Sequence, residues 1–165
     1  MAMRWLLSIA VTLLAACSSS PRLEYTPPDF QTALNAVNAA RDAARTCTHG
    51  SNTQSYAAAP ALSWNGLLGE VARQRAKYIQ QTGEFSHQEG SSSTFAVVTR
   101  SQQNGYRFKE IRENLAQGFS TATEAVDAWL NSTQGHCNTL MAANLRDMGM
   151  VKAGDYWVLV AAEPQ

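Results

Sequence analysis

Two cysteines far apart in the chain constrain its fold more than any other feature. The sequence contains three cysteines, Cys17, Cys47 and Cys137. Cys17 closes an apolar leader, which leaves Cys47 and Cys137 as the pair in an exported chain, where disulfides persist. We therefore expect a Cys47–Cys137 bridge, which brings the start and the end of the domain together. By the chain-entropy argument, such a bridge contributes roughly 4–5 kcal/mol to stability.

The alternative for Cys137 is a reactive thiol, because His136 stands beside it in the stretch QGHCNTLM. An adjacent imidazole can serve as the base of a thiol nucleophile, and the two side chains can also bind a metal. A bridged sulfur does neither, so we expect Cys137 to belong to the scaffold. Because adjacent side chains diverge, we expect His136 to face a pocket while Cys137 faces Cys47.

The N-terminus predicts export and a lipid anchor. Arg4 precedes an apolar run over residues 5–16, which is shorter than the roughly 20 residues that a membrane span needs. We interpret residues 1–16 as a signal peptide. The sequence LAAC, which ends at Cys17, resembles the lipobox of bacterial lipoproteins, whose cysteine sulfur receives a diacylglycerol. Ser18 resembles an outer-membrane sorting signal, so we expect an envelope protein held on that membrane, facing the periplasm or the cell surface.

The rest of the chain divides into a tether and one domain. Residues 17–28 are rich in Ser and Pro, and such a segment stays extended and solvated. Residues 29–165 suffice for a single domain with a sizeable core, which we expect to be a monomer. The chain has 13 basic and 13 acidic residues, and this balance argues against nucleic acid as a partner.

The apolar pattern predicts mostly helices, with a few strands late in the chain. Thr121 and Glu124 form a capping box at the start of one helix. We expect helices over 30–45, between Asn65 and Gly83, over 94–103, from Thr121 and briefly after Gly135; a loop over 46–59; mixed strand and loop over 106–118; and strands over 148–151 and 156–161. This order is typical of the α+β class.

Five stretches occur in an order that resembles the CAP superfamily of cysteine-rich secretory, antigen 5 and pathogenesis-related proteins. They are LSWNGLLGEVARQRAKYI, FSHQ, ENLAQG, AVDAWLNSTQGHCNTLM and MGMV…DYWVLV. The resemblance is closest to the bacterial secreted branch and covers about residues 30–161. It implies a three-layer α-β-α sandwich, with a small antiparallel sheet between helices and an open cleft.

The resemblance also implies a site in this cleft. His87 of FSHQ, Glu113 of ENLA and His136 of GHCNTLM match residues that converge in the family's cleft, where some members bind zinc or another divalent cation. Two imidazoles and a carboxylate are in themselves a plausible zinc set. Ser132 stands where eukaryotic members have a second glutamate. Arg112 replaces a glycine before Glu113, and its guanidinium is a candidate competitor for that carboxylate.

Several functions follow from these residues. We expect foremost a binding module for a small apolar or lipid-like ligand or an envelope partner. The alternatives are a metal-assisted hydrolase with Glu113 as general base, and a structural envelope protein with an inert cleft. Ser132 could also act as a nucleophile with His136 as its base. Finally, His136 or Glu113 could be structural, with Glu113 only orienting a histidine.

Overall fold

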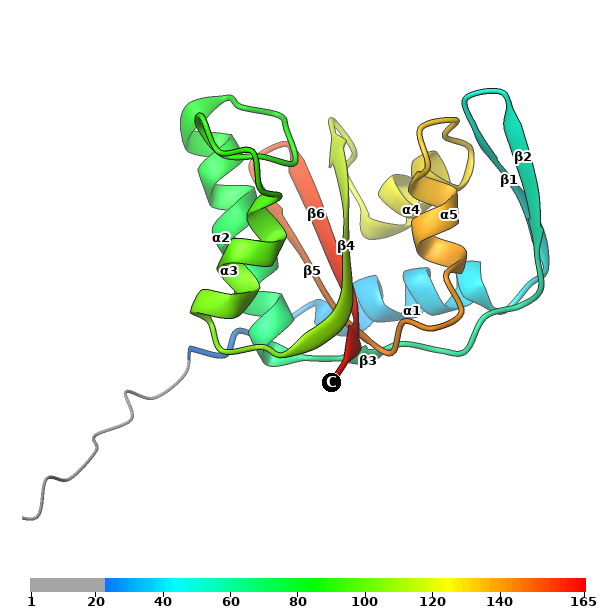
Figure 1. The fold of residues 1–165 in the computed structure, drawn as a ribbon, viewed down its shortest axis with the longest axis horizontal. Coiled ribbons are helices and arrows are strands. Elements are labelled where there is room, and N and C mark those ends of the chain that lie inside the picture. The colour runs from blue at the N-terminus through cyan, green and yellow to red at the C-terminus, as the bar shows by residue number, and fades with distance from the viewer. Residues whose placement is uncertain (1–22) are drawn as a thin grey trace, which may run out of the picture.

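The computed structural model describes residues 23–165 of the chain. The expected signal peptide, the lipid-attachment residue Cys17 and the first half of the expected tether lie outside these residues. The elements (Figure 1) are α1 Phe30–Arg41, β1 Arg45–His49, β2 Asn52–Tyr56, β3 Ser63–Trp64, α2 Gly66–Thr82, α3 Ala96–Gln103, β4 Phe108–Gln117, α4 Ala122–Leu130, α5 His136–Met141, β5 Asp147–Ala153 and β6 Tyr156–Pro164. Within residues 23–165, no helix is both long and apolar enough to cross a membrane.

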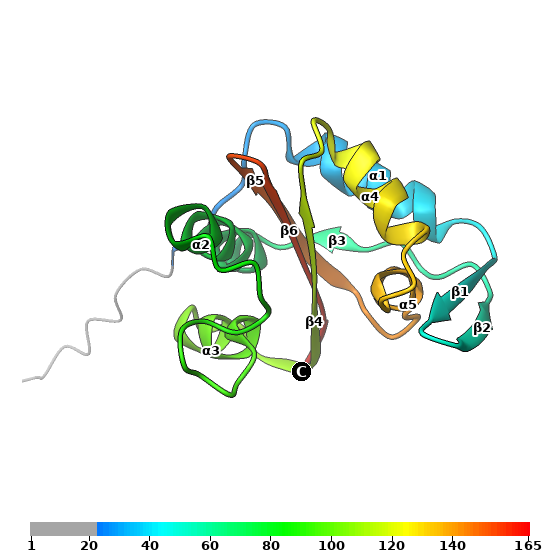
Figure 2. The ribbon, with the colours of Figure 1, turned by 90° about the horizontal axis from the view of Figure 1, so that it is seen from above.

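The centre of the molecule is a sheet between two layers of helices. Its strand order is β3-β5-β6-β4, with β3 parallel to β5 and the other pairs antiparallel. Helices α2 and α3 cover one face, and α1, α4 and α5 cover the other (Figure 2). The predicted α+β class and α-β-α sandwich are confirmed. The small sheet, expected to be antiparallel, is mixed: β3 pairs in parallel with β5, because a long crossover and not a hairpin joins them.

Strand β6 is buried on both of its faces. Side chains alternate across a strand, so Leu159 and Ala161 pack with α1 and α4, while Val158 and Val160 pack with α2. Each of the four is at most 2% exposed. The continuous apolar run in this part of the sequence is typical of a strand that is covered by a layer on each side.

The first described segment packs against α2. The N–H of Tyr25 donates to the carbonyl of Gly66 at 2.9 Å. A Cβ at Gly69 would lie 2.2 Å from the Tyr25 carbonyl oxygen, and a Cβ at Gly149 would lie 2.3 Å from the Gly69 nitrogen. Glycine at both positions therefore lets this segment, α2 and β5 touch directly. Residues 23–28, expected as the end of a solvated tether, are docked on the domain.

The observed helix ends agree with the predicted ones where the sequence contains strong capping signals. The side chain of Asn65 accepts from the N–H of Leu67 at 3.0 Å, and Gly83 ends α2 with a φ of 74°. Thr121 and Glu124 make both hydrogen bonds of the predicted capping box of α4. The predicted boundaries of α2 and the predicted start of α4 are therefore confirmed.

The segment between α1 and α2 differs most from expectation. The first helix ends at Arg41, before the expected Arg45. The predicted loop over 46–59 is wrong, since it contains most of the antiparallel hairpin β1–β2. Cys47 is the only buried residue of these two strands, so the hairpin lacks the apolar alternation that marks a strand in a sequence. The region of mixed character over 106–118 contains the long strand β4.

Candidate functional site

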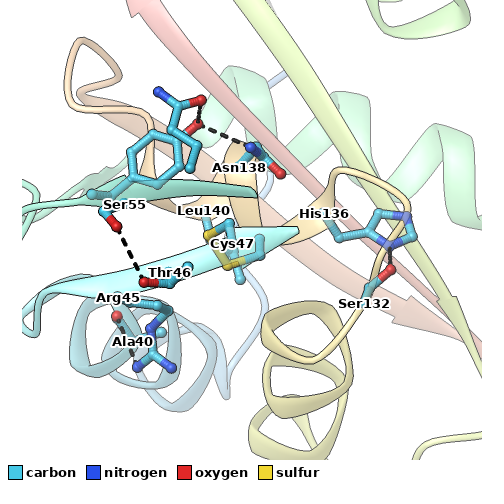
Figure 3. Close-up of a disulfide and its surroundings, with 12 residues drawn as sticks. Ala40, Arg45, Thr46, Cys47, Ser55, Ser132, His136, Asn138 and Leu140 are labelled. Atoms are coloured by element: carbon cyan, nitrogen blue, oxygen red, sulfur yellow. Dashed lines mark hydrogen bonds between the residues drawn. A yellow bond between two sulfur atoms is a disulfide. The ribbon is translucent and has the colours of Figure 1, made fainter. Parts of the chain in front are cut away.

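The predicted bridge between Cys47 and Cys137 is present (Figure 3). The two Cα atoms are 5.5 Å apart, and both residues are buried. The bridge joins β1 to α5, and the N–H of Gly50 in the hairpin turn donates to the carbonyl of Thr133 at 2.9 Å. Because its sulfur is bridged, Cys137 has no thiolate, and the alternative of a reactive thiol is wrong.

His136 begins α5 and points away from the disulfide (Figure 3). Its Nδ1 lies 2.9 Å from the hydroxyl oxygen of Ser132. Gly135, with a φ of 87°, makes the sharp turn into α5. Burial, and secondly the charge of His87, lower the pKa of His136 below its usual value, so the ring is neutral at neutral pH.

Glu113 lies on β4, and both of its carboxylate oxygens are engaged. Oε2 lies 2.7 Å from Nδ1 of His87. Nε of Arg75 donates to Oε1 at 2.8 Å, and Nη2 of Arg75 donates to Oε2 at 3.4 Å. The side chain of Glu113 is 2% exposed and that of Arg75 is 0% exposed, so water reaches this ion pair very little.

Arg75 is the site residue that sequence reasoning missed. It also donates to Glu89 Oε1 at 2.7 Å and to the Ser86 carbonyl at 2.5 Å. Through these bonds it ties the loop of His87 to α2. The signal was present in the sequence, because an arginine on the apolar face of a helix needs a buried partner. Its partner, Glu113, could not be chosen without the fold.

Arg112, which the sequence offered as the competitor for Glu113, faces the opposite side of the sheet. Neighbouring residues on a strand alternate between faces. The Arg112 guanidinium accordingly binds the carboxylate of Glu110, and it approaches the carbonyl of Asn138 at 3.4 Å. The guanidinium that holds Glu113 therefore comes from α2 and not from the neighbouring position on β4.

A cleft of about 210 Å³ opens beside His87 and Glu113. Phe95 and Val97 form its wall on the α3 side, and Thr139 of α5 lies on the other side. Phe95 is 56% exposed, and its ring meets the His87 ring edge-on, with 6.1 Å between centroids. The residues that line the cleft are His87, Phe95, Val97, Ile111, Arg112, Glu113 and Thr139.

The four predicted cleft residues form two pairs. His87 and Glu113 bond to each other and line the cleft. Ser132 and His136 bond to each other but are not among its lining residues. Asn114, the neighbour of Glu113 on β4, connects the pairs, because its Nδ2 donates to the carbonyl of His136 at 3.0 Å.

The match to a known family agrees with this architecture. The profile of the cysteine-rich secretory protein family, CAP, matches residues 34–160, from within α1 to within β6. The chain belongs to the CAP family. The expected membership is therefore confirmed, and the cleft described above lies within the matched part of the CAP domain.

Relatives of this CAP domain occur in several bacteria. The protein YkwD of Bacillus subtilis strain 168 is 30% identical over 99 residues, which are 58% of this chain and 37% of YkwD. An extracellular SCP-domain protein of Bacillus anthracis superposes with a TM-score of 0.58 at 25% identity, covering 64% of this chain and 34% of that protein. An outer surface protein of Borrelia burgdorferi gives a TM-score of 0.55 at 22% identity, covering 65% of this chain and 80% of that protein. The chain thus spans little more than a third of the two Bacillus proteins.

The resemblance implies that His87, His136 and Glu113 of this CAP domain can hold a divalent cation. The oxygens of Glu113 bond to Arg75 and His87, and Nδ1 of His136 bonds to Ser132. Within residues 23–165, no group of three or more His, Cys, Asp or Glu is placed to hold a metal ion. The expected set of three ligands does not fit this arrangement, and the function proposed below uses no metal.

Proposed function

We propose that this CAP protein is a binding module of the bacterial envelope, held on a membrane by a lipid on Cys17. Its cleft binds an apolar or lipid-like ligand or a partner protein. The LAAC sequence at residues 14–17 supports the anchor. The extracellular and outer surface proteins among the relatives support a place outside the cytoplasm.

The hydrogen bonding of the Glu113 carboxylate is the observation that favours a binding function over hydrolysis. A general base needs a carboxylate that can take a proton from a bound water. Both oxygens of Glu113 already accept hydrogen bonds from the buried guanidinium of Arg75, and Oε2 also bonds to Nδ1 of His87. This carboxylate therefore acts as a fixed support that orients His87, while the wall beside it offers the exposed ring of Phe95 to a ligand.

The exposed phenylalanines provide a matched test of the cleft. Phe95 lines the cleft, whereas Phe85, 47% exposed, packs against Tyr156 with 5.8 Å between ring centroids and lies outside it. We expect the full chain in mild detergent to bind the apolar dye Nile red, and Phe95→Ser to weaken binding several-fold. Phe85→Ser should leave the affinity unchanged. Equal effects of the two variants, measured by fluorescence titration, would place the apolar site elsewhere.

A further inference from the structure

We propose that the cleft takes an extended polypeptide, which joins the sheet as a strand beside β4. This inference rests on the proposed binding function and names the chemical class of the ligand. Strand β4 is the last in the order β3-β5-β6-β4, so only one of its edges is paired. Within residues 23–165 no strand lies along its other edge, which faces the viewer between α3 and α5 in Figure 1.

Backbone groups of Ile111 and Glu113 point toward this free edge. Along a strand, successive residues direct their N–H and C=O groups to opposite sides. Gly118 donates to the carbonyl of Asp155 at 2.9 Å, at the β5–β6 turn, so the even-numbered residues of β4 face β6. The odd-numbered Leu115 faces outward, since its carbonyl accepts from an indole N–H of α4 at 2.8 Å.

Ile111 and Glu113 are therefore the outward-facing residues beside the cleft. Within residues 23–165, their backbone N–H and C=O groups make no hydrogen bond outside the sheet ladder. Both residues also line the cleft, so its floor is an open stretch of sheet edge. Two outward residues separated by one inward residue present the donor and acceptor spacing with which an added strand pairs.

The walls of the cleft fit the side chains of such a strand. Phe95 and Val97 stand on one side of the β4 edge, and Thr139 stands on the other. In an extended peptide, successive side chains point to opposite faces. One row would therefore meet the apolar wall of α3, and the other would meet the polar wall of α5. We expect apolar residues at every second position of the ligand.

A lipid chain would match only part of this surface. It would cover Phe95 and Val97 but would shield the backbone groups of Ile111 and Glu113 from water without pairing them, which is unfavourable. An extended peptide supplies both the apolar side chains and the missing backbone partners, as in other cases where a peptide is added to a sheet edge. The geometry therefore favours a polypeptide over a lipid.

The probe for the test is a decapeptide. A random decapeptide library displayed on phage is selected on the full chain in mild detergent, and the most enriched peptide is synthesised. Its affinity is measured by calorimetry, and its ability to displace Nile red shows whether it occupies the cleft. Methyl groups are then placed on the peptide backbone nitrogens, one at a time. We expect weaker binding at alternate positions only, because every second N–H pairs with β4.

Two substitutions at one position test the same pairing from the side of the protein. Ile111→Pro removes the outward N–H but leaves the ladder to β6, because proline is tolerated where a strand N–H faces outward. Ile111→Ala shortens the same side chain and keeps the N–H. We expect Ile111→Pro to bind the peptide about tenfold or more weakly than Ile111→Ala. If the proline variant does not fold, the methyl scan decides alone.

The outcomes separate this inference from the proposed function. Loss of affinity at alternate methylated positions, with displacement of Nile red, supports the strand. A peptide whose affinity is insensitive to backbone methylation overturns it. If no peptide is enriched while Nile red binding still depends on Phe95, the strand is excluded and the apolar binding module remains. If neither a peptide nor the dye binds at the cleft, both proposals fail.

Discussion

Arg75 connects three parts of the molecule through one buried guanidinium. It holds Glu113 on β4 and reaches Glu89 and the Ser86 carbonyl in the loop after α2. His87 lies in the same loop and bonds to the same carboxylate. The position of the cleft histidine therefore depends on a side chain that does not line the cleft.

Removing this guanidinium should be strongly destabilising. Arg75→Ala leaves the buried carboxylate of Glu113 without its guanidinium partner, and breaking a buried ion pair typically costs about 3–5 kcal/mol of unfolding free energy. Arg107→Ala, at an exposed arginine, is the matched control and should change stability by less than about 0.5 kcal/mol. Urea unfolding of both variants measures the difference; similar small losses would show that the Arg75 network adds little.

His136 should make the protein sensitive to acid. Its pKa is lowered in the folded state by burial and by the charge of His87, so below the usual value near 6.5 the unfolded chain binds the proton more readily. The free energy of unfolding should therefore fall as the pH drops through this value and level off below the folded-state pKa.

The variant His136→Gln should lose part of this pH dependence. Urea unfolding at pH 7.5 and at pH 5 gives the difference in stability between the two conditions, and this difference should be smaller in the variant than in the wild type. His49→Gln removes an exposed histidine of the hairpin and should behave as the wild type does. If His136→Gln left the pH dependence of stability unchanged, the lowered pKa of His136 would not be the cause of the acid sensitivity.

Among the elements, the hairpin β1–β2 depends on its covalent bond. Cys47 is its only buried residue, and an isolated two-stranded hairpin is at best marginally stable in water. Reduction of the Cys47–Cys137 bridge should lower the free energy of unfolding by about 2–5 kcal/mol. Amide hydrogens of β1 and β2 should lose their protection, whereas those of β5 and β6 should keep most of theirs. Uniform loss across all four strands, seen by hydrogen exchange, would show that the bridge stabilises the domain as a whole.

The elements also show how far the sequence predicts this structure. Helices α2 and α4 could be predicted because Asn65, Gly83 and the Thr121 capping box are local signals. The hairpin could not, because its strands are polar and are held by a bridge to a distant helix. The disulfide itself followed from cysteine count and export. The pairing of Arg75 with Glu113 could not be predicted, because a long-range contact between a helix and a strand leaves no periodic pattern.

At the scale of the whole molecule, the proposed lipid anchor predicts that one substitution changes the processing and the location of the protein. Cys17→Ser removes the sulfur that would receive the diacylglycerol, so we expect the variant to remain an uncleaved or mislocalised precursor. Cell fractionation and metabolic labelling with a fatty acid measure this. Wild-type amounts of mature, membrane-bound variant protein would contradict the lipoprotein proposal. Ser18→Ala keeps the cysteine and serves as the control for lipidation.

The docked segment before α1 limits how far the domain could move from the proposed lipid anchor on Cys17. Because Tyr25 is held at Gly66, a lipid on Cys17 would connect to the docked segment through the six peptide units from Cys17 to Leu23, which can span at most about 20 Å. If the segment before α1 were not docked, the connection from Cys17 to the start of α1 could span about twice this distance. In Figure 1 the first described segment lies at the lower end of the molecule, and the loop that carries His87 lies at the upper end. If Cys17 carries a lipid as proposed, this short connection would hold the domain close to the bilayer, with the His87 loop at the end of the domain far from the anchor.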